Sequence, residues 1–260
     1  WMTSTPKGFN WLHKLSQDEG TATHFASTRD NTALPDDFYE FVQGRYTSEL
    51  AQQELEGQFI DLAGGLFKRA WLPVFTGSLP DAHKGLRYRF WDLAVSTKAS
   101  ADFTATARVT ITDDARIFID GLWQGRASWP EVKKRIIDTA RSEPDTEVGI
   151  ETIAGFEIAH AELLQAPELA HVAMRSIKPS RDKATRAAPL AARAERGKVM
   201  LMAGAYTEDL IGQAVAFPDV KHDDLIDAAS GALTMTVGSI GARIKVGRSR
   251  TQAGRRKVEW

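Results

Sequence analysis

Cysteine is absent from the 260-residue sequence. Disulfide bonds, thiol nucleophiles and cysteine-based zinc sites are therefore excluded, and the composition fits a reducing compartment. Long apolar runs are also missing, because none approaches the roughly 20 residues that a membrane-spanning helix needs. We therefore expect a globular chain without a membrane partner.

A large excess of either charge is missing as well, since 33 Lys and Arg residues nearly balance 34 Asp and Glu residues. The formal net charge of −1 excludes a uniformly basic coat, so any affinity for DNA must come from local patches. The pattern Gly-x-x-x-x-Gly-Lys-Ser/Thr of a phosphate-binding loop does not occur either. This chain alone should therefore not hydrolyse ATP.

The first 85 residues are typical of a small unit followed by a connection. Residues 1–8 favour a strand end and a Pro/Gly loop, and 23–27 favour a short strand. Helical periodicity with capping signals covers 34–59. Glycine and proline then predict a linker at 71–85.

From residue 86 onward, the pattern predicts an α/β fold. Three consecutive strands, at 86–94, 103–112 and 116–123, suggest a meander, and a capping box at Ser128 begins a helix that ends near 141. Alternating strands and helices follow. The strands are expected at 147–152, 172–177 and 199–202, with helices at 156–165, from 182 with an interruption at Pro189, and twice more after 202. This order describes a mixed sheet flanked by helices.

Three acidic stretches fall where chemistry is expected. Asp92 ends an aromatic, β-favouring strand, and Glu151 ends another strand. A late helix begins with Asp223 and Asp224, and Asp227 follows three residues after Asp224 on the same face. Two divalent ions about 4 Å apart can activate water and stabilise the charge of a phosphodiester, and hard oxygen ligands suit Mg²⁺ or Mn²⁺. These five acids are our metal-ligand candidates.

Each acid also has a structural explanation. Asp92 could be a strand-end turn residue, Glu151 a surface acid, and Asp223 or Asp224 an N-cap. Together they favour a metal site, because acids that converge on one edge repel each other unless a cation neutralises them. We interpret His222 as a structural or supporting residue, since the acids already suffice for a hard ion.

Basic residues near the strand end at 177 are candidates for DNA-phosphate contact. They are Lys178, Arg181, Lys183 and Arg186. A solvated, charged helix face is the alternative for this cluster. The basic segment 239–260 lacks apolar anchors, and we expect it to be disordered.

Four ordered motifs resemble the nuclease domain of phage terminase large subunits: Trp91-Asp-Leu-Ala94, Gly149-Ile-Glu-Thr152, Lys183-Ala-Thr-Arg-Ala187 and Lys221-His-Asp-Asp-Leu-Ile-Asp-Ala228. The resemblance implies an RNase H-like nuclease domain at 86–238. It assigns two Mg²⁺ or Mn²⁺ ions to Asp92, Glu151 and the group of Asp223, Asp224 and Asp227. The principal ligand within that group stays open. We favour Asp224 with Asp227 assisting, so the expected catalytic residues are Asp92, Glu151, Asp224 and Asp227.

The resemblance extends upstream. Ser4-Thr-Pro-Lys-Gly8 resembles the coupling motif near the end of the terminase ATPase core, so 1–70 is expected to be a partial P-loop ATPase remnant and the chain a piece of a longer protein. The implied function is cutting of double-stranded viral DNA in the host cytoplasm, with the terminase small subunit and the portal protein as partners.

Two other functions stay open at this stage. A resolvase-like or transposase-like nuclease would share the same acidic site. A catalytically silent DNA-clamping module would use the acids only to brace helices.

Overall fold

The computed structural model describes residues 2–6, 11–60, 65–77, 79, 85–94, 102–152, 157–178 and 182–236. Within these residues the strands are β1 (Val74–Phe75), β2 (Leu86–Asp92), β3 (Thr104–Ile111), β4 (Ile117–Gly125), β5 (Thr146–Glu151), β6 (Met174–Ile177) and β7 (Val199–Met202). The α-helices are α1 (Trp11–Ser16), α2 (Phe38–Gln43), α3 (Ser48–Glu56), α4 (Trp129–Ser142), α5 (Glu157–Leu164), α6 (Lys183–Glu195), α7 (Thr207–Ala216) and α8 (Asp224–Thr234).

The strands form one mixed sheet in the order β1-β7-β4-β3-β2-β5-β6. β3 runs antiparallel to its neighbours β2 and β4, which confirms the predicted meander, and the other neighbouring pairs are parallel. The carboxyl ends of β2, β5 and β6 therefore meet at one edge of the sheet. Because Trp91 pairs with Ile150, the residues that follow them, Asp92 and Glu151, end adjacent strands at that edge.

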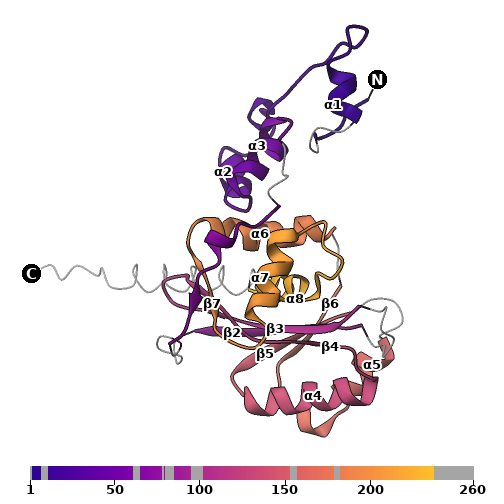
Figure 1. Ribbon diagram of the computed structural model, residues 1–260, viewed down its shortest axis with the longest axis vertical. Helices are drawn as coiled ribbons and strands as arrows, with labels where there is room; N and C mark the ends of the chain where they lie inside the picture. The colour runs from indigo at the N-terminus through magenta and orange to yellow at the C-terminus, as the bar shows by residue number, and fades with distance from the viewer. Residues whose placement is uncertain are drawn as a thin grey trace, which may run out of the picture.

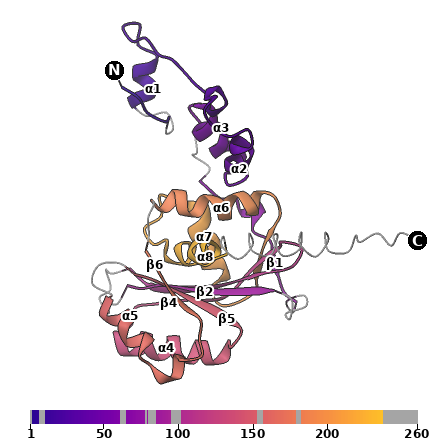
Figure 2. The same cartoon turned by 180° about the vertical axis from the view of Figure 1, so that it is seen from behind.

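Helices cover both faces of the sheet. Figures 1 and 2 show α6, α7 and α8 on one face and α4 and α5 on the other. Successive side chains of β2 alternate between these layers. Phe90 belongs to the core beneath α6, α7 and α8, whereas Trp91 belongs to the core against α4. Asp92 therefore shares the face of Phe90.

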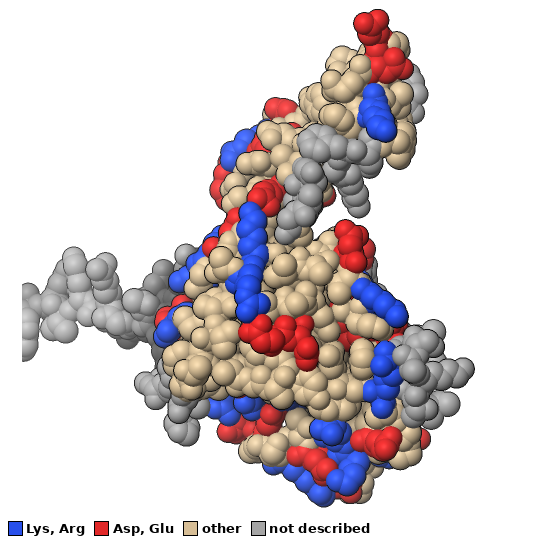
Figure 3. Space-filling view, viewed as in Figure 1, with Lys and Arg blue, Asp and Glu red and all other residues tan. Residues whose placement is uncertain are grey.

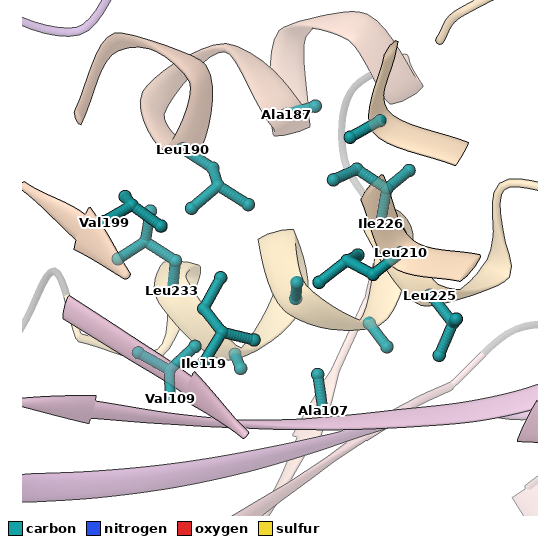
Figure 4. Close-up of a cluster of buried hydrophobic side chains, with 14 of the residues drawn as sticks. Ala107, Val109, Ile119, Ala187, Leu190, Val199, Leu210, Leu225, Ile226 and Leu233 are labelled. Atoms are coloured by element: carbon teal, nitrogen blue, oxygen red, sulfur yellow. The ribbon is translucent and has the colours of Figure 1, made fainter. Parts of the chain in front are cut away.

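The core beneath α8 is tightly packed (Figure 4). A Cβ atom added to Gly231 of α8 would lie 2.4 Å from the ring of Phe90, and one added to Gly149 of β5 would lie 2.5 Å from the Met235 sulfur. Real Cβ atoms do not approach that closely. The two glycines therefore let α8 lie directly on β2 and β5, which brings the start of α8 to the sheet.

Several local predictions were wrong. α6 runs through Pro189 without interruption, because its buried alanine and leucine side chains pack on the core and outweigh the roughly 3 kcal/mol cost of an internal proline. Residues 23–27 and the described part of 1–8 form no strand. β-favouring residues there have no strand to pair with, and Ser27 instead caps a short 3-10 helix.

The region predicted as a linker, 71–85, contributes to the sheet. Val74 and Phe75 form β1, which pairs with β7, and Phe67 just upstream is fully buried in the core. The sheet unit therefore includes residues before 86. The expected disordered segment 239–260 lies outside the described residues. None of the helices in the described part of the chain combines the length and the apolar character that crossing a membrane requires.

Candidate functional site

Asp92 and Glu151 lie side by side where β2 and β5 end. Their side chains share the α8 face of the sheet, since Phe90 and Gly149, two residues before each acid, contact α8 or the residue that follows it. Glu151 lies close enough to Asp92 that its proximity contributes to the raised pKa of Asp92.

The start of α8 brings three more acids to this edge. Asp223, Asp224 and Asp227 are 9%, 5% and 4% exposed. Asp223 occupies the N-cap position, but its side chain makes no capping hydrogen bond. Instead, Gln213 of α7 accepts hydrogen bonds from the backbone N–H groups of Leu225 and Ile226, at 2.8 and 3.4 Å. The capping explanation therefore fails for Asp223, whose carboxylate does not bind the N–H groups of α8.

The five acids form one electrostatic unit. Burial raises the pKa of Asp92 well above its ordinary value, and the proximity and charge of Glu151 and the charges of Asp227 and Asp224 raise it further. Burial, with the charge of Asp102, raises the pKa of Asp224 to about 6. Burial also raises the pKa of Asp227, although Arg186 and Lys183 oppose the shift. In their ionised forms these acids therefore destabilise the folded protein when no metal is bound.

Two cations from α6 lie among these acids. Lys183 Nζ is 2.6 Å from Asp223 Oδ1 and 3.1 Å from Asp227 Oδ2. Arg186 Nη1 is 2.8 Å from Glu151 Oε1, and its Nη2 is 3.4 Å from Asp227 Oδ1. Partial burial disfavours the charged form of Lys183, but the hydrogen bond to Asp223 and the charge of Asp227 outweigh it and raise the lysine pKa. Both cations are counter-ions of the acids in this structure.

The donor set suits a hard divalent ion. Among the described residues, no three acidic or histidine side chains already surround one metal position. However, Asp224 Oδ2 is buried without a hydrogen-bond partner, and the acids whose charges act on Asp92 offer carboxylate oxygens as ligands. Mg²⁺ and Mn²⁺ prefer such ligands. The residues therefore fit a divalent cation. In this structure Lys183 and Arg186 form ion pairs with the carboxylates that would bind it.

Two further residues adjoin Asp224: His222, which the sequence indicated as a structural or supporting residue, and Asp102, which was not among the predicted site residues. His222 Nδ1 lies 4.0 Å from Asp224 Oδ2 and 3.8 Å from Asp102 Oδ1, and the His222 ring packs edge-on against Phe103. Asp102 and Phe103 precede β3, which pairs with β2 beside Asp92. The predicted meander was the signal that could have placed them there.

The predicted DNA contacts divide into groups. Lys183 and Arg186 join the acids, as described above. Lys178 is exposed and follows Ile177, which pairs with Glu151, so it lies at the same edge. Arg181 lies outside the described residues. Figure 3 shows basic and acidic side chains interspersed on the visible face.

Comparison with known proteins identifies one family. Residues 89–236 match the family model of the terminase RNase H-like domain. No curated protein sequence matches this chain.

Three solved structures are similar to this chain. The large terminase from a thermophilic bacteriophage superposes with a TM-score of 0.55 at 12% identity, over 81% of this chain and 54% of that chain. The complex of the same phage protein with ADP gives a TM-score of 0.54 at 12% identity, over 78% and 52%. The large terminase nuclease from thermophilic phage G20c with bound magnesium gives 0.48 at 13% identity, over 66% and 97%. This chain thus spans about half the length of the first of these proteins.

Proposed function

Because this chain belongs to the terminase RNase H-like domain family, we propose that it is a metal-dependent endonuclease that cuts double-stranded viral DNA during genome packaging. The observation that carries the proposal is the convergence of Asp92, Glu151, Asp224 and Asp227 at one sheet edge, with the pKa of three of them raised. A nuclease of this type needs such a set of carboxylates to hold its cations.

We assign distinct tasks to the residues of the site. Asp92, Glu151, Asp224 and Asp227 would hold two Mg²⁺ or Mn²⁺ ions, with Asp223 as a supporting ligand. The bound ions supply an activated water and offset the negative charge of the phosphodiester. Asp92 is the central ligand in this proposal, because the charges of Glu151, Asp224 and Asp227 all act on it.

The remaining tasks concern DNA and partners. Lys178 and Arg181 would contact DNA phosphates, which needs no base recognition and weakens with salt. Lys183 and Arg186 would join them once the acids hold metal. Double-stranded DNA, the terminase small subunit, the portal protein and a location in the host cytoplasm are part of the proposal.

Plasmid nicking tests the nuclease. The parent, Asp92→Asn and Asp224→Asn are compared with Mn²⁺ or Mg²⁺ at matched DNA binding. Asp138→Asn is the control, because Asp138 is an exposed partner of Lys134 on α4. We expect cutting by the parent and the control, with a loss of at least about tenfold in the two site variants, since removing a residue that only supports a metal ligand typically costs about 10–100-fold. Equal cutting by all four proteins would refute the assignment.

A DNA clamp without catalysis is the second candidate. The observation in its favour is that Lys183 and Arg186 neutralise part of the acidic cluster, so the acids also brace α6 against α8. Binding of duplex DNA without cutting by any variant, with Mg²⁺ or Mn²⁺ present, would select this function.

A further inference from the structure

α6 joins the acidic site to the N-terminal helices. Its first turns carry Lys183 and Arg186, which hold the carboxylates as described above. The residues at its other end are Glu195 and Arg196. At 1.5 Å per residue, about 20 Å of helix separates the two ends. Figures 1 and 2 show α2 and α3 next to α6 on the side away from the sheet.

The contacts at the far end are specific. Arg196 donates from Nη1 to the Gly44 carbonyl oxygen at 2.7 Å, and from Nη2 to the carbonyl oxygens of Gln43 and Tyr46 at 3.3 Å each. The Gln43 and Gly44 carbonyls lie at the C-terminal end of α2, where a helix carries partial negative charge, and Tyr46 lies between α2 and α3. Glu195 Oε2 accepts a hydrogen bond at 2.9 Å from the Ser48 N–H at the start of α3. The C-terminal end of α6 is therefore hydrogen-bonded to the segment that contains α2 and α3, outside the sheet unit.

The body of α6 buries mostly small side chains against its support. Its buried side chains are five alanines and Leu190: Ala187, Ala188, Leu190, Ala191, Ala192 and Ala194. Small side chains interlock little with a neighbouring helix, and packed helices move past each other by small shear displacements. A shift of α6 changes the distances at both of its ends.

We propose that α6 couples the position of α2 and α3 to the metal affinity of the acidic site. Docking of Arg196 and Glu195 holds α6 where Lys183 and Arg186 occupy the carboxylates, and release of that docking loosens the two cations and lets metal compete better. This inference rests on the proposed function for the identity of the ligand, and on the contacts of α6 for the coupling.

Mn²⁺ affinity, measured by calorimetry without DNA, tests the coupling. Arg196→Ala should bind Mn²⁺ about threefold or more tightly than the parent, a size typical of residues that modulate coupling between sites. Arg193→Ala is the matched control, because Arg193 lies one turn earlier and donates to the Pro189 carbonyl within α6. It should bind Mn²⁺ like the parent.

A second comparison tests the route. In the variant Lys183→Gln/Arg186→Gln, the cations that α6 would move are gone, so adding Arg196→Ala should leave Mn²⁺ affinity unchanged. An equal increase from Arg196→Ala in both backgrounds would refute the route through these cations. Equal Mn²⁺ affinity of the parent and Arg196→Ala would refute the coupling while leaving the nuclease in place.

Hydrogen exchange of the metal-free protein gives a readout that needs no metal, and a uniform loss of protection would identify a variant that folds poorly. Arg196→Ala should lower protection about threefold or more at amides 186–188 of α6 and 227–229 of α8, compared with Arg193→Ala. Absence of Mn²⁺ binding in every protein would reject the proposed function, and this exchange result would still decide the coupling. Loss of protection confined to residues 193–196 would refute the coupling between the two ends of α6.

Discussion

The buried carboxylate of Asp224 should destabilise the metal-free protein at neutral pH. Its pKa is about 6 in the folded chain against an ordinary value of 3.8, with burial as the largest cause. A shift of roughly two pKa units corresponds to about 3 kcal/mol, at about 1.4 kcal/mol for each unit. Asp224→Asn removes the charge and should therefore raise the free energy of unfolding by up to about 3 kcal/mol.

The sign of the pH dependence follows from the raised pKa. The folded state binds the Asp224 proton more tightly than the unfolded state, so this group costs nothing below about pH 4, and its cost grows until about pH 6. The stability gain of Asp224→Asn should therefore be absent at pH 4, appear as pH rises and be complete at pH 7.5. A gain of about 3 kcal/mol raises the melting temperature by roughly 6–12 °C for a domain of this size.

Thermal unfolding in EDTA at pH 4, 5, 6 and 7.5 measures this gain, with Asp138→Asn as the exposed control. The control should change stability by less than about 0.5 kcal/mol at every pH. Mn²⁺ at pH 7.5 should then stabilise the parent but not Asp224→Asn. A variant no more stable than the parent at pH 7.5, or a gain that does not vary with pH, would show that Asp224 is not a strained carboxylate.

Two further predictions concern the stability of the sheet unit, one for helix packing and one for a buried ion pair. Gly231→Ala should destabilise the protein by about 1–3 kcal/mol in urea titrations and weaken Mn²⁺ binding, because the added Cβ meets the Phe90 ring and lifts α8 from the sheet. Gly212→Ala in α7, where the new Cβ meets open space, should be neutral or stabilise by up to about 1 kcal/mol, and the reverse order would contradict this explanation. Arg89→Met should cost about 3–5 kcal/mol, since Arg89 is buried and its loss leaves the partly buried Glu143 with Arg108 as its remaining cationic partner. Arg116→Met, which breaks the exposed ion pair with Asp114, should cost under about 1 kcal/mol. Similar urea midpoints for these two arginine variants would refute the role of Arg89.

Much of the fold was predictable because it depends on local pattern. Alternation along 86–123 indicated three strands with correct neighbours, and the structure has them within two residues of the predicted bounds. The convergence of Asp92 and Glu151 also follows from pattern. Both acids end apolar strands, and parallel strands bring their carboxyl ends to the same edge.

Contacts between distant segments were not predictable in this way. Nothing in the local sequence of α7 shows that Gln213 receives the first N–H groups of α8, although this contact releases Asp223 from capping. The charge pattern of Lys183 and Arg186 was visible, but a cation on a helix face fits a phosphate and a carboxylate equally well. The position of α6 in the folded chain is what pairs Lys183 and Arg186 with carboxylates when no metal is bound. β1 was missed because two residues carry too little periodicity to indicate a strand.

The acidic site carries an excess of negative charge that metal binding should change. Five carboxylates share the site with Lys183 and Arg186, which leaves three negative charges uncompensated when every group is ionised. The raised pKa of Asp92 favours its protonated form in the metal-free protein, which reduces this charge. Metal ligands must be deprotonated, so metal binding should release protons. Calorimetry of Mn²⁺ binding in buffers of different ionisation enthalpy measures that release. We expect more protons to be released at pH 6 than at pH 8, and an equal number at both would mean that the carboxyl proton is not displaced by the metal.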